Sequence, residues 1–214
     1  MSKNATDWVA EKLATSETLE IVERTPEDFL VVRSKGNYTF PIAVLGVKDV
    51  IELANVEPLF TGAAKPQFVV NVPSKTLWSG NAIRRIHAAS AAFGTLGDVS
   101  RAASTGHAGS YRDKNMDFFI NAMKQHSNVS YVSYIYDSVF KADRRIGLSL
   151  TVAVIDAYNM SAEDVRNAKA RFGHFDVIVK SSSTGSITHQ AEAVAKSMDA
   201  EALTFSELMR RLAK

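Results

Sequence analysis

The spacing of hydrophobic positions changes along the chain, and it begins with a pattern typical of an antiparallel sheet. Residues 7–14 carry apolar side chains at helical spacing, and three short runs of strand-forming residues follow at 19–22, 29–32 and 38–44. Polar turn residues separate these runs, including a Gly-Asn pair that suits a hairpin. The first part of the chain therefore predicts one helix followed by an antiparallel meander.

The middle of the chain has a less regular pattern and contains its most flexible-looking segment. The predicted elements are a helix over 47–54, a strand over 68–72, helices over 80–91 and 98–104, a helix over 115–126 and a strand over 129–135. Gly, Ser and Thr dominate the start of segment 104–114, so we expect either a loop over a site or a hinge there.

The last third alternates clearly between strands and helices. The predicted elements are strands over 148–155 and 177–179 and helices over 161–172, 188–198 and 206–212. Such alternation indicates a βαβα unit with parallel strands. We therefore expect a mixed α/β fold, in which the N-terminal antiparallel meander continues into a C-terminal βαβα unit and forms one mixed sheet flanked by helices.

Composition narrows the class of protein. A chain of 214 residues with 46% hydrophobic residues is long enough for a sizeable core, and we expect one domain over residues 1–214. The absence of Cys excludes disulfide scaffolds, thiolate metal sites and a cysteine nucleophile. The sequence has no apolar run of membrane-spanning length and no secretory h-region at its start. We therefore expect a cytoplasmic protein that does not use a membrane as partner.

Charge is nearly balanced over the whole chain but not along it. The net charge is +2, and the basic excess lies between residues 80 and 145. A basic strip of this kind could face a polyanion such as a nucleic acid, and Arg144 and Arg145 are its candidate ligand-binding residues. The alternative is a solvated surface whose basic side chains pair with nearby carboxylates. Both interpretations stay open on the sequence alone.

Familiar catalytic motifs are missing from this sequence. It contains no Gly-x-Gly-x-x-Gly after a strand, no P-loop, no Gly-x-Ser-x-Gly elbow and no His-Glu-x-x-His. The short carboxylate-x-Lys spacing that is common in metal-dependent nucleases is absent as well. Whether the protein is an enzyme therefore stays open.

The strongest positive signal is a hydroxyl-rich loop that joins the strand at 177–179 to the following helix. Backbone N–H groups and hydroxyls at the start of a helix favour an anion, and ligands of open α/β sheets bind beyond the carboxyl ends of the strands. The run Ser182-Ser183-Thr184-Gly185-Ser186-Ile187-Thr188 is similar to the Ser/Thr-x-Thr-Gly-x-Thr phosphate loop of flavodoxins, which follows the first strand there. The candidate ligand-binding residues are Ser182, Ser183, Thr184, Gly185, Ser186 and Thr188. An ordinary capped loop is the alternative.

Three further residues are candidates for catalysis at the same edge of the sheet. Asp156 directly follows a predicted strand, Lys180 ends the next one, and His189 follows the loop. An acid, a lysine and an anion-holding loop could together bind Mg²⁺ and a phosphate ester, with Asp156 as the metal ligand. His189 could move a proton. The alternative roles are a turn for Asp156 and an exposed surface position for His189.

Two functions from different classes fit these observations. The first is binding of a phosphate ligand, a nucleic acid or a nucleotide, with metal-dependent phosphodiesterase or nuclease activity as its catalytic form. The second is a non-catalytic interaction or assembly protein, for which a homo-oligomer is one arrangement. Only the first assigns a role to the loop after residues 177–179.

Overall fold

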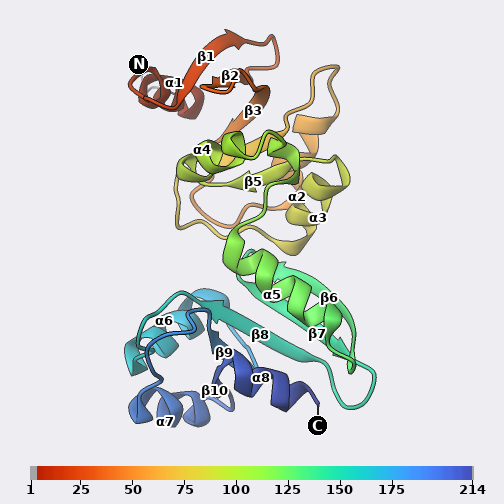
Figure 1. Cartoon of the computed structure of the whole chain (residues 1–214), viewed down its shortest axis with the longest axis vertical. Helices are drawn as coiled ribbons and strands as arrows, with labels where there is room; N and C mark the ends of the chain where they lie inside the picture. Colours follow the sequence, from red (N-terminus) through yellow and green to blue (C-terminus); the bar gives the residue numbers. More distant parts are fainter. Residues whose placement is uncertain (1–3, 214) are drawn as a thin grey trace. The chain divides into compact units, whose positions relative to one another are not determined.

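The chain consists of two compact units, each built around its own sheet. A computed structural model describes residues 4–213, and the chain divides between Asp113 and Lys114. Each unit contains a five-stranded sheet, with the strand order β1-β2-β3-β4-β5 in the first and β10-β9-β8-β7-β6 in the second (Figure 1). The division falls at the end of the segment for which we expected a loop or hinge. The expectation of a single domain stays a prediction.

The first unit carries its antiparallel strands before its parallel ones. Its elements are α1 (Ala5–Ala14), β1 (Leu19–Arg24), β2 (Leu30–Ser34), β3 (Thr39–Leu45), α2 (Leu53–Val56), η1 (Glu57–Phe60), β4 (Phe68–Asn71), α3 (Gly80–Ala88), β5 (Ala92–Gly94), α4 (Leu96–Ser104) and η2 (Ala108–Ser110). The first three strands pair antiparallel, and β3, β4 and β5 pair parallel. Phe40, Ile42 and Phe68 are fully buried, so the sheet provides the centre of this unit's core.

The second unit repeats this order of elements. They are α5 (Lys114–Gln125), β6 (Val129–Tyr136), β7 (Val139–Arg144), β8 (Leu150–Ile155), α6 (Ala162–Phe172), β9 (Val177–Lys180), α7 (His189–Ser197), β10 (Glu201–Thr204) and α8 (Phe205–Leu212). Strands β6, β7 and β8 pair antiparallel, and β8, β9 and β10 pair parallel. In both units a helix precedes three antiparallel strands, and two further strands alternate with helices.

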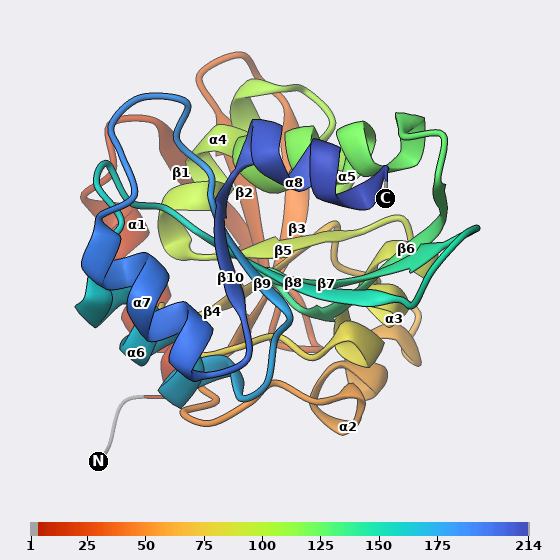
Figure 2. The same cartoon turned by 90° about the horizontal axis from the view of Figure 1, so that it is seen from below.

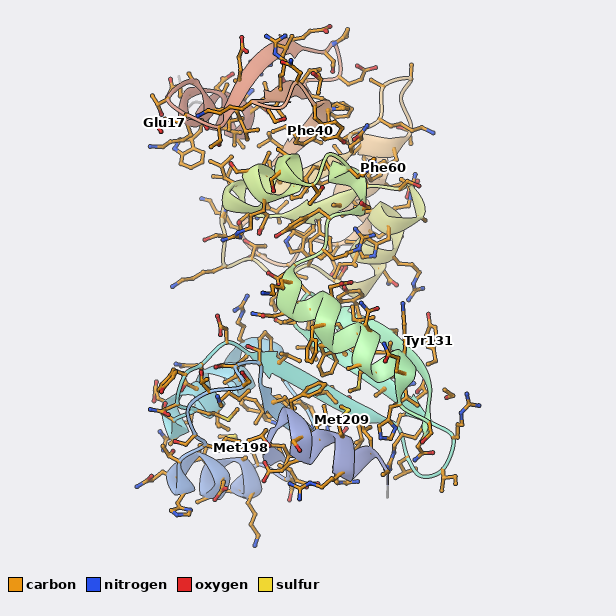
Figure 3. The ribbon with its side chains drawn as sticks, viewed as in Figure 1. Glu17, Phe40, Phe60, Tyr131, Met198 and Met209 are labelled. Atoms are coloured by element: carbon orange, nitrogen blue, oxygen red, sulfur yellow. The ribbon has the colours of Figure 1, made fainter. Side chains whose placement is uncertain are left out.

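Helices cover both faces of the second sheet because its central strands are apolar on both sides. Val152 and Val177 face a cluster that includes Phe119 of α5 and Leu208 of α8. Alternate residues such as Ile178 face a second cluster that includes Ala191 of α7. Figure 2 shows α5 and α8 on one side of this sheet and α6 and α7 on the other. Strands buried on both faces read as continuous hydrophobic runs, which is why the sequence predicted them clearly.

The mixed α/β class and its order of antiparallel and then parallel strands are confirmed. One part of the expectation is wrong, because the strands form two mixed sheets and not one. Three strands were also missed, namely β5, β7 and β10. β5 contains a glycine, and β7 and β10 contain residues such as Lys, Asp and Glu that rarely favour strands. Pairing with neighbouring strands stabilises them despite their low propensity.

The helix expected over 47–54 is wrong for most of its length. Residues 47–52 are not helical, and the helix begins only at Leu53. The backbone N–H of Ile51 donates to the carbonyl of Leu77 (2.8 Å), and its carbonyl accepts from Ser79 (2.9 Å). Ile51 therefore forms an isolated parallel bridge with Trp78. A tertiary contact replaces the helical hydrogen bonds that the apolar spacing suggested.

Candidate functional site

The site lies at the carboxyl ends of β8 and β9, which are parallel neighbours in the second unit. Ile155 is paired with Lys180, so the residues that follow them emerge at the same edge of the sheet. The hydroxyl of Ser181 lies 3.4 Å from Oδ1 of Asp156. The structure thus brings Asp156 and the start of the 181–188 loop together.

Lys180 is buried inside this loop. Only 1% of its surface is exposed, and its ammonium donates hydrogen bonds to the carbonyls of Ser182 (2.7 Å) and Thr184. An ammonium carries three N–H groups, so one is left after these two bonds. Within residues 4–213, no ion pair includes Lys180. A buried positive charge without a carboxylate partner costs free energy that a bound anion would offset.

The loop is held against the segment that follows β8. Gly185 has a φ of 78°, and a Cβ there would collide with the carbonyl of Tyr158. Next to it, Ser186 donates from its backbone N–H (2.8 Å) and its hydroxyl (3.1 Å) to Oδ1 of Asn159. Glycine is required at position 185 because it combines a left-handed conformation with close backbone approach. The contacts of Gly185 and Ser186 therefore fix the conformation of the loop.

The candidate hydroxyl groups of the loop are of two kinds, those on exposed residues and one that caps a helix. Ser183, Thr184 and Ser186 are exposed, and Ser182 is partly exposed with its hydroxyl 3.0 Å from that of Thr184. The hydroxyl of Thr188 instead caps α7, because it accepts from the backbone N–H of Ala191 (3.2 Å) and donates to Met160 (3.1 Å). Residues 182–186 thus form the accessible part of the loop.

His189 lies on the surface at the start of α7. Its side chain is fully exposed, and Nδ1 lies 3.2 Å from Oε2 of Glu192, which is on the same helix. The ring therefore has a surface partner one helical turn away. This placement agrees with the alternative of an exposed surface histidine.

The structure does not bring Arg144 and Arg145 to this loop. β7 runs antiparallel to β8 and pairs Ala142 with Leu150, so the two arginines lie beyond the amino end of β8. Asp156 follows the carboxyl end of that strand, six residues after Leu150 (156 − 150), which is about 20 Å at 3.3 Å per residue. Nε of Arg144 donates to Leu148 (2.6 Å), and Nε of Arg145 donates to Ser127 (3.1 Å).

A cavity at this opposite edge was missed by the sequence reasoning. It has a volume of about 400 Å³, and Arg144, Lys196 and Arg211 line it together with Asp176 and Glu201. Arg211 pairs with Glu201 at 2.7 Å, and Asp176 accepts from the backbone N–H of Thr151 (2.6 Å). Acidic side chains thus accompany the basic ones around this cavity. Its residues come from separate elements, so no sequence motif could have indicated it.

The equivalent loop of the first unit is closed. Asn71 ends β4 as Lys180 ends β9, and its amide donates to the carbonyls of Val47 (3.0 Å) and Pro73 (3.0 Å). In the loop that follows, Thr76 and Trp78 are buried. The ring of Trp78 packs against Phe93 with 4.9 Å between centroids. The second half of this loop is therefore packed into the unit and only Ser74 and Lys75 are exposed, whereas residues 183–186 of the second unit's loop are all exposed.

Comparison with protein-family models, curated proteins and solved structures finds no match to this chain. The site is therefore interpreted from its own geometry. Among residues 4–213, no group of three or more His, Asp or Glu side chains is arranged to hold a metal ion. In the same part of the chain, no helix is both long and apolar enough to cross a membrane.

Proposed function

We propose that the open loop around Lys180 binds a phosphate group of a nucleotide or a nucleic acid. The observation that carries this proposal is the buried ammonium, which has no carboxylate partner among the described residues and binds carbonyls of a loop whose residues 183–186 are exposed. A phosphate would supply the missing negative charge. It would also accept hydrogen bonds from Ser183 and Thr184.

The position of the loop adds to this argument. It joins the carboxyl end of β9 to the N-terminus of α7, a nine-residue helix whose dipole favours negative charge. Burial strengthens the attraction, because an ammonium removed from water is screened less by solvent and salt. The helix dipole, the loop hydroxyls and the buried charge would therefore all act on the same phosphate group.

Binding alone, without catalysis, is the proposal that the geometry favours. Lys180 already donates to Ser182 and Thr184, so its role is to hold charge and not to transfer a proton. Asp156 is the side chain that could hold Mg²⁺, yet it belongs to no group of three such ligands in the described chain. Phosphodiester hydrolysis and the part of Mg²⁺ in it remain predictions beyond this proposal.

The proposal is tested by isothermal titration with inorganic phosphate, ATP and a short single-stranded oligonucleotide, at low and at moderate salt. We expect binding that weakens as salt rises and at least a tenfold loss of affinity in Ser183→Asp, which puts a negative charge on the exposed loop. Ser74→Asp changes an exposed serine in the equivalent loop of the first unit and is the matched control. Equal affinity of the two variants, or no binding by the unmodified protein, would contradict the proposal.

The alternative function is non-catalytic assembly, and one observation favours it. In the loop between β7 and β8, 71% of the surface of Ile146 and 84% of that of Leu148 are exposed. Two exposed apolar side chains in one short loop fit an interaction surface. Light scattering during size-exclusion chromatography tests whether the chain forms a homo-oligomer, and Leu148→Ser should dissociate it if this loop makes the contact.

A further inference from the structure

We infer that this chain is a tandem duplication of one unit with the order αβββαβαβα, and that the ligand loop is open in the second copy and filled in the first. The statement about the loops rests on the proposed function, whereas the duplication does not. It is carried by details of register, loop hydrogen bonding and unusual backbone conformation that recur at an offset of 110 positions up to β3 and 109 positions after it.

The parallel strands have the same register in both units. Ile42 pairs with Phe68, which pairs with Ala92, and Val152 pairs with Val177 in the same way. Val177 in turn pairs with Glu201. Phe68 and Val177 are 109 positions apart (177 − 68), and the same offset relates Ala92 to Glu201. Ile42 and Val152 are 110 positions apart (152 − 42), so one residue is deleted between β8 and β9 relative to the first unit. A shared fold class requires the strand order but not chain lengths between the strands that agree this closely.

The irregular connections repeat at the same offset. Ile51 forms an isolated bridge with Trp78, and Met160 forms one with Ile187. In the second unit Met160 donates to the carbonyl of Ser186 (2.9 Å) and accepts from Thr188 (3.0 Å). These bonds correspond one for one to those of Ile51 with Leu77 and Ser79 described above. A bridge outside the regular strands is a detail that unrelated sheets of this class have no physical reason to share.

Unusual backbone conformations recur as well. Ser90 and Asp199 follow α3 and α7 with φ of 55° and 57°. Asn37 and Gly147, in the hairpins before β3 and β8, have φ of 61° and 90°. Positive φ is uncommon for residues other than glycine, so its recurrence at equivalent positions is informative. The capping boxes Thr95 with Asp98 and Thr204 with Glu207 follow the same offset.

The two copies differ most in the loop after the central parallel strand. The first unit ends β4 with Asn71 and closes the loop with buried Leu77 and Trp78. The second ends β9 with Lys180 and leaves residues 183–186 exposed. Neutral Asn71 needs no counter-anion, whereas buried Lys180 does. Divergence after duplication thus accounts for one anion site in a chain that contains two such loops.

The test is a reciprocal loop exchange in the full-length chain. One variant receives residues 181–186 in place of 72–77 together with Asn71→Lys, and keeps Trp78. The other receives residues 72–77 in place of 181–186 together with Lys180→Asn. The control is the same pair of exchanges with each inserted segment shifted by one residue along its own unit. Circular dichroism, urea unfolding and phosphate titration are measured for each variant.

We expect both matched exchanges to fold cooperatively and the shifted exchange to unfold. Phosphate stoichiometry should be one for the unmodified chain, two for the variant with the loop in the first unit and zero for the other. If the matched exchanges fold no better than the shifted one, the duplication is overturned. If they fold and the first unit gains no site, the statement about the filled loop is overturned. If the unmodified chain binds no phosphate, the proposed function fails, while folded exchanges still support the duplication.

Discussion

Asn71 and Lys180 occupy the same position in the two units, at the last residue of the central parallel strand, and each is a buried polar side chain that binds backbone carbonyls. Asn71 is 2% exposed and donates to Val47 and Pro73, while Lys180 is 1% exposed and donates to Ser182 and Thr184. The amide of Asn71 is neutral, so its burial leaves no charge to compensate. The ammonium adds a charge, and this difference underlies the proposal of an anion site in the second unit only.

This relationship predicts that both side chains stabilise the fold in the absence of ligand. Asn71→Ala and Lys180→Met should each lower the free energy of unfolding by roughly 1–3 kcal/mol, because each removes two hydrogen bonds from a buried side chain to backbone carbonyls. Urea unfolding measures the effect. Phosphate should raise the midpoint of the unmodified chain and of Asn71→Ala, but not that of Lys180→Met. A phosphate-dependent shift in Lys180→Met would place the ligand elsewhere.

Gly185→Ala should destabilise the protein more than substitution of another glycine with similar φ. At Gly185 the new Cβ would meet the carbonyl of Tyr158, whereas Gly106, with a φ of 70°, has no neighbouring atom within 4 Å of a Cβ. We expect a loss of roughly 1 kcal/mol for Gly106→Ala and roughly 2–4 kcal/mol for Gly185→Ala. Equal losses in urea unfolding would mean that the loop does not lie tightly against Tyr158.

The lowered pKa of His87 predicts that the free energy of unfolding falls in mild acid. Burial, with the positive charge of Arg112, lowers the pKa of His87 to about 4 from its usual 6.5. The unfolded chain therefore binds a proton at a higher pH than the folded chain does. The contribution of the neutral ring to the free energy of unfolding is fully present above about pH 6.5 and is lost as the pH falls towards 4. We expect the loss to be roughly 2 kcal/mol, since solvent around the partly exposed ring reduces the effect.

Unfolding free energies measured between pH 4 and 7 check this prediction. His87→Gln should flatten the pH dependence, and His107→Gln, which changes an exposed histidine of the same unit, should not. An unchanged slope in His87→Gln would assign the acid sensitivity to other groups.

Tyr111 predicts a loss of stability in strong base. Burial, together with the hydrogen bond that its hydroxyl donates to Asp98 (2.8 Å), raises the pKa of Tyr111 to about 12. Because the unfolded phenol ionises near its usual value of 10, stability declines as the pH rises from 10 to 12. Ultraviolet titration should show a late-ionising phenol that belongs to Tyr111. Tyr111→Phe should remove it and cost about 1 kcal/mol at neutral pH.

The sequence predicted β8, α6 and β9 of the second unit clearly, for a local reason. β8 and β9 are apolar along their whole length, and α6 begins with a capping box at Ser161 and Asp164, so each element carries its own signal. Residues 47–52 were wrongly predicted as helical and β10 was missed, because the conformation of both depends on partners elsewhere in the chain. Pairing across the sheet overrides weak local preference.

Part of the candidate site also followed from the sequence, since parallel strands place their carboxyl ends at one edge and so bring Asp156 and Ser181 together. The burial of Lys180, the capping role of Thr188 and the separation of Arg144 from the loop did not follow, because they depend on which way strands run and where side chains find acceptors.

The sequence by itself determined the mixed α/β class, the order of antiparallel and parallel strands, and the hydroxyl-rich loop at a strand's carboxyl end. These features depend on spacing and propensity, which act over a few residues. Only the tertiary structure decided that there are two sheets and that one unit occurs twice. Burial is non-directional, so different apolar residues fill equivalent places and leave little trace in the sequence. Hydrogen bonding is directional, and its recurrence in the folded chain is what reveals the repeated unit.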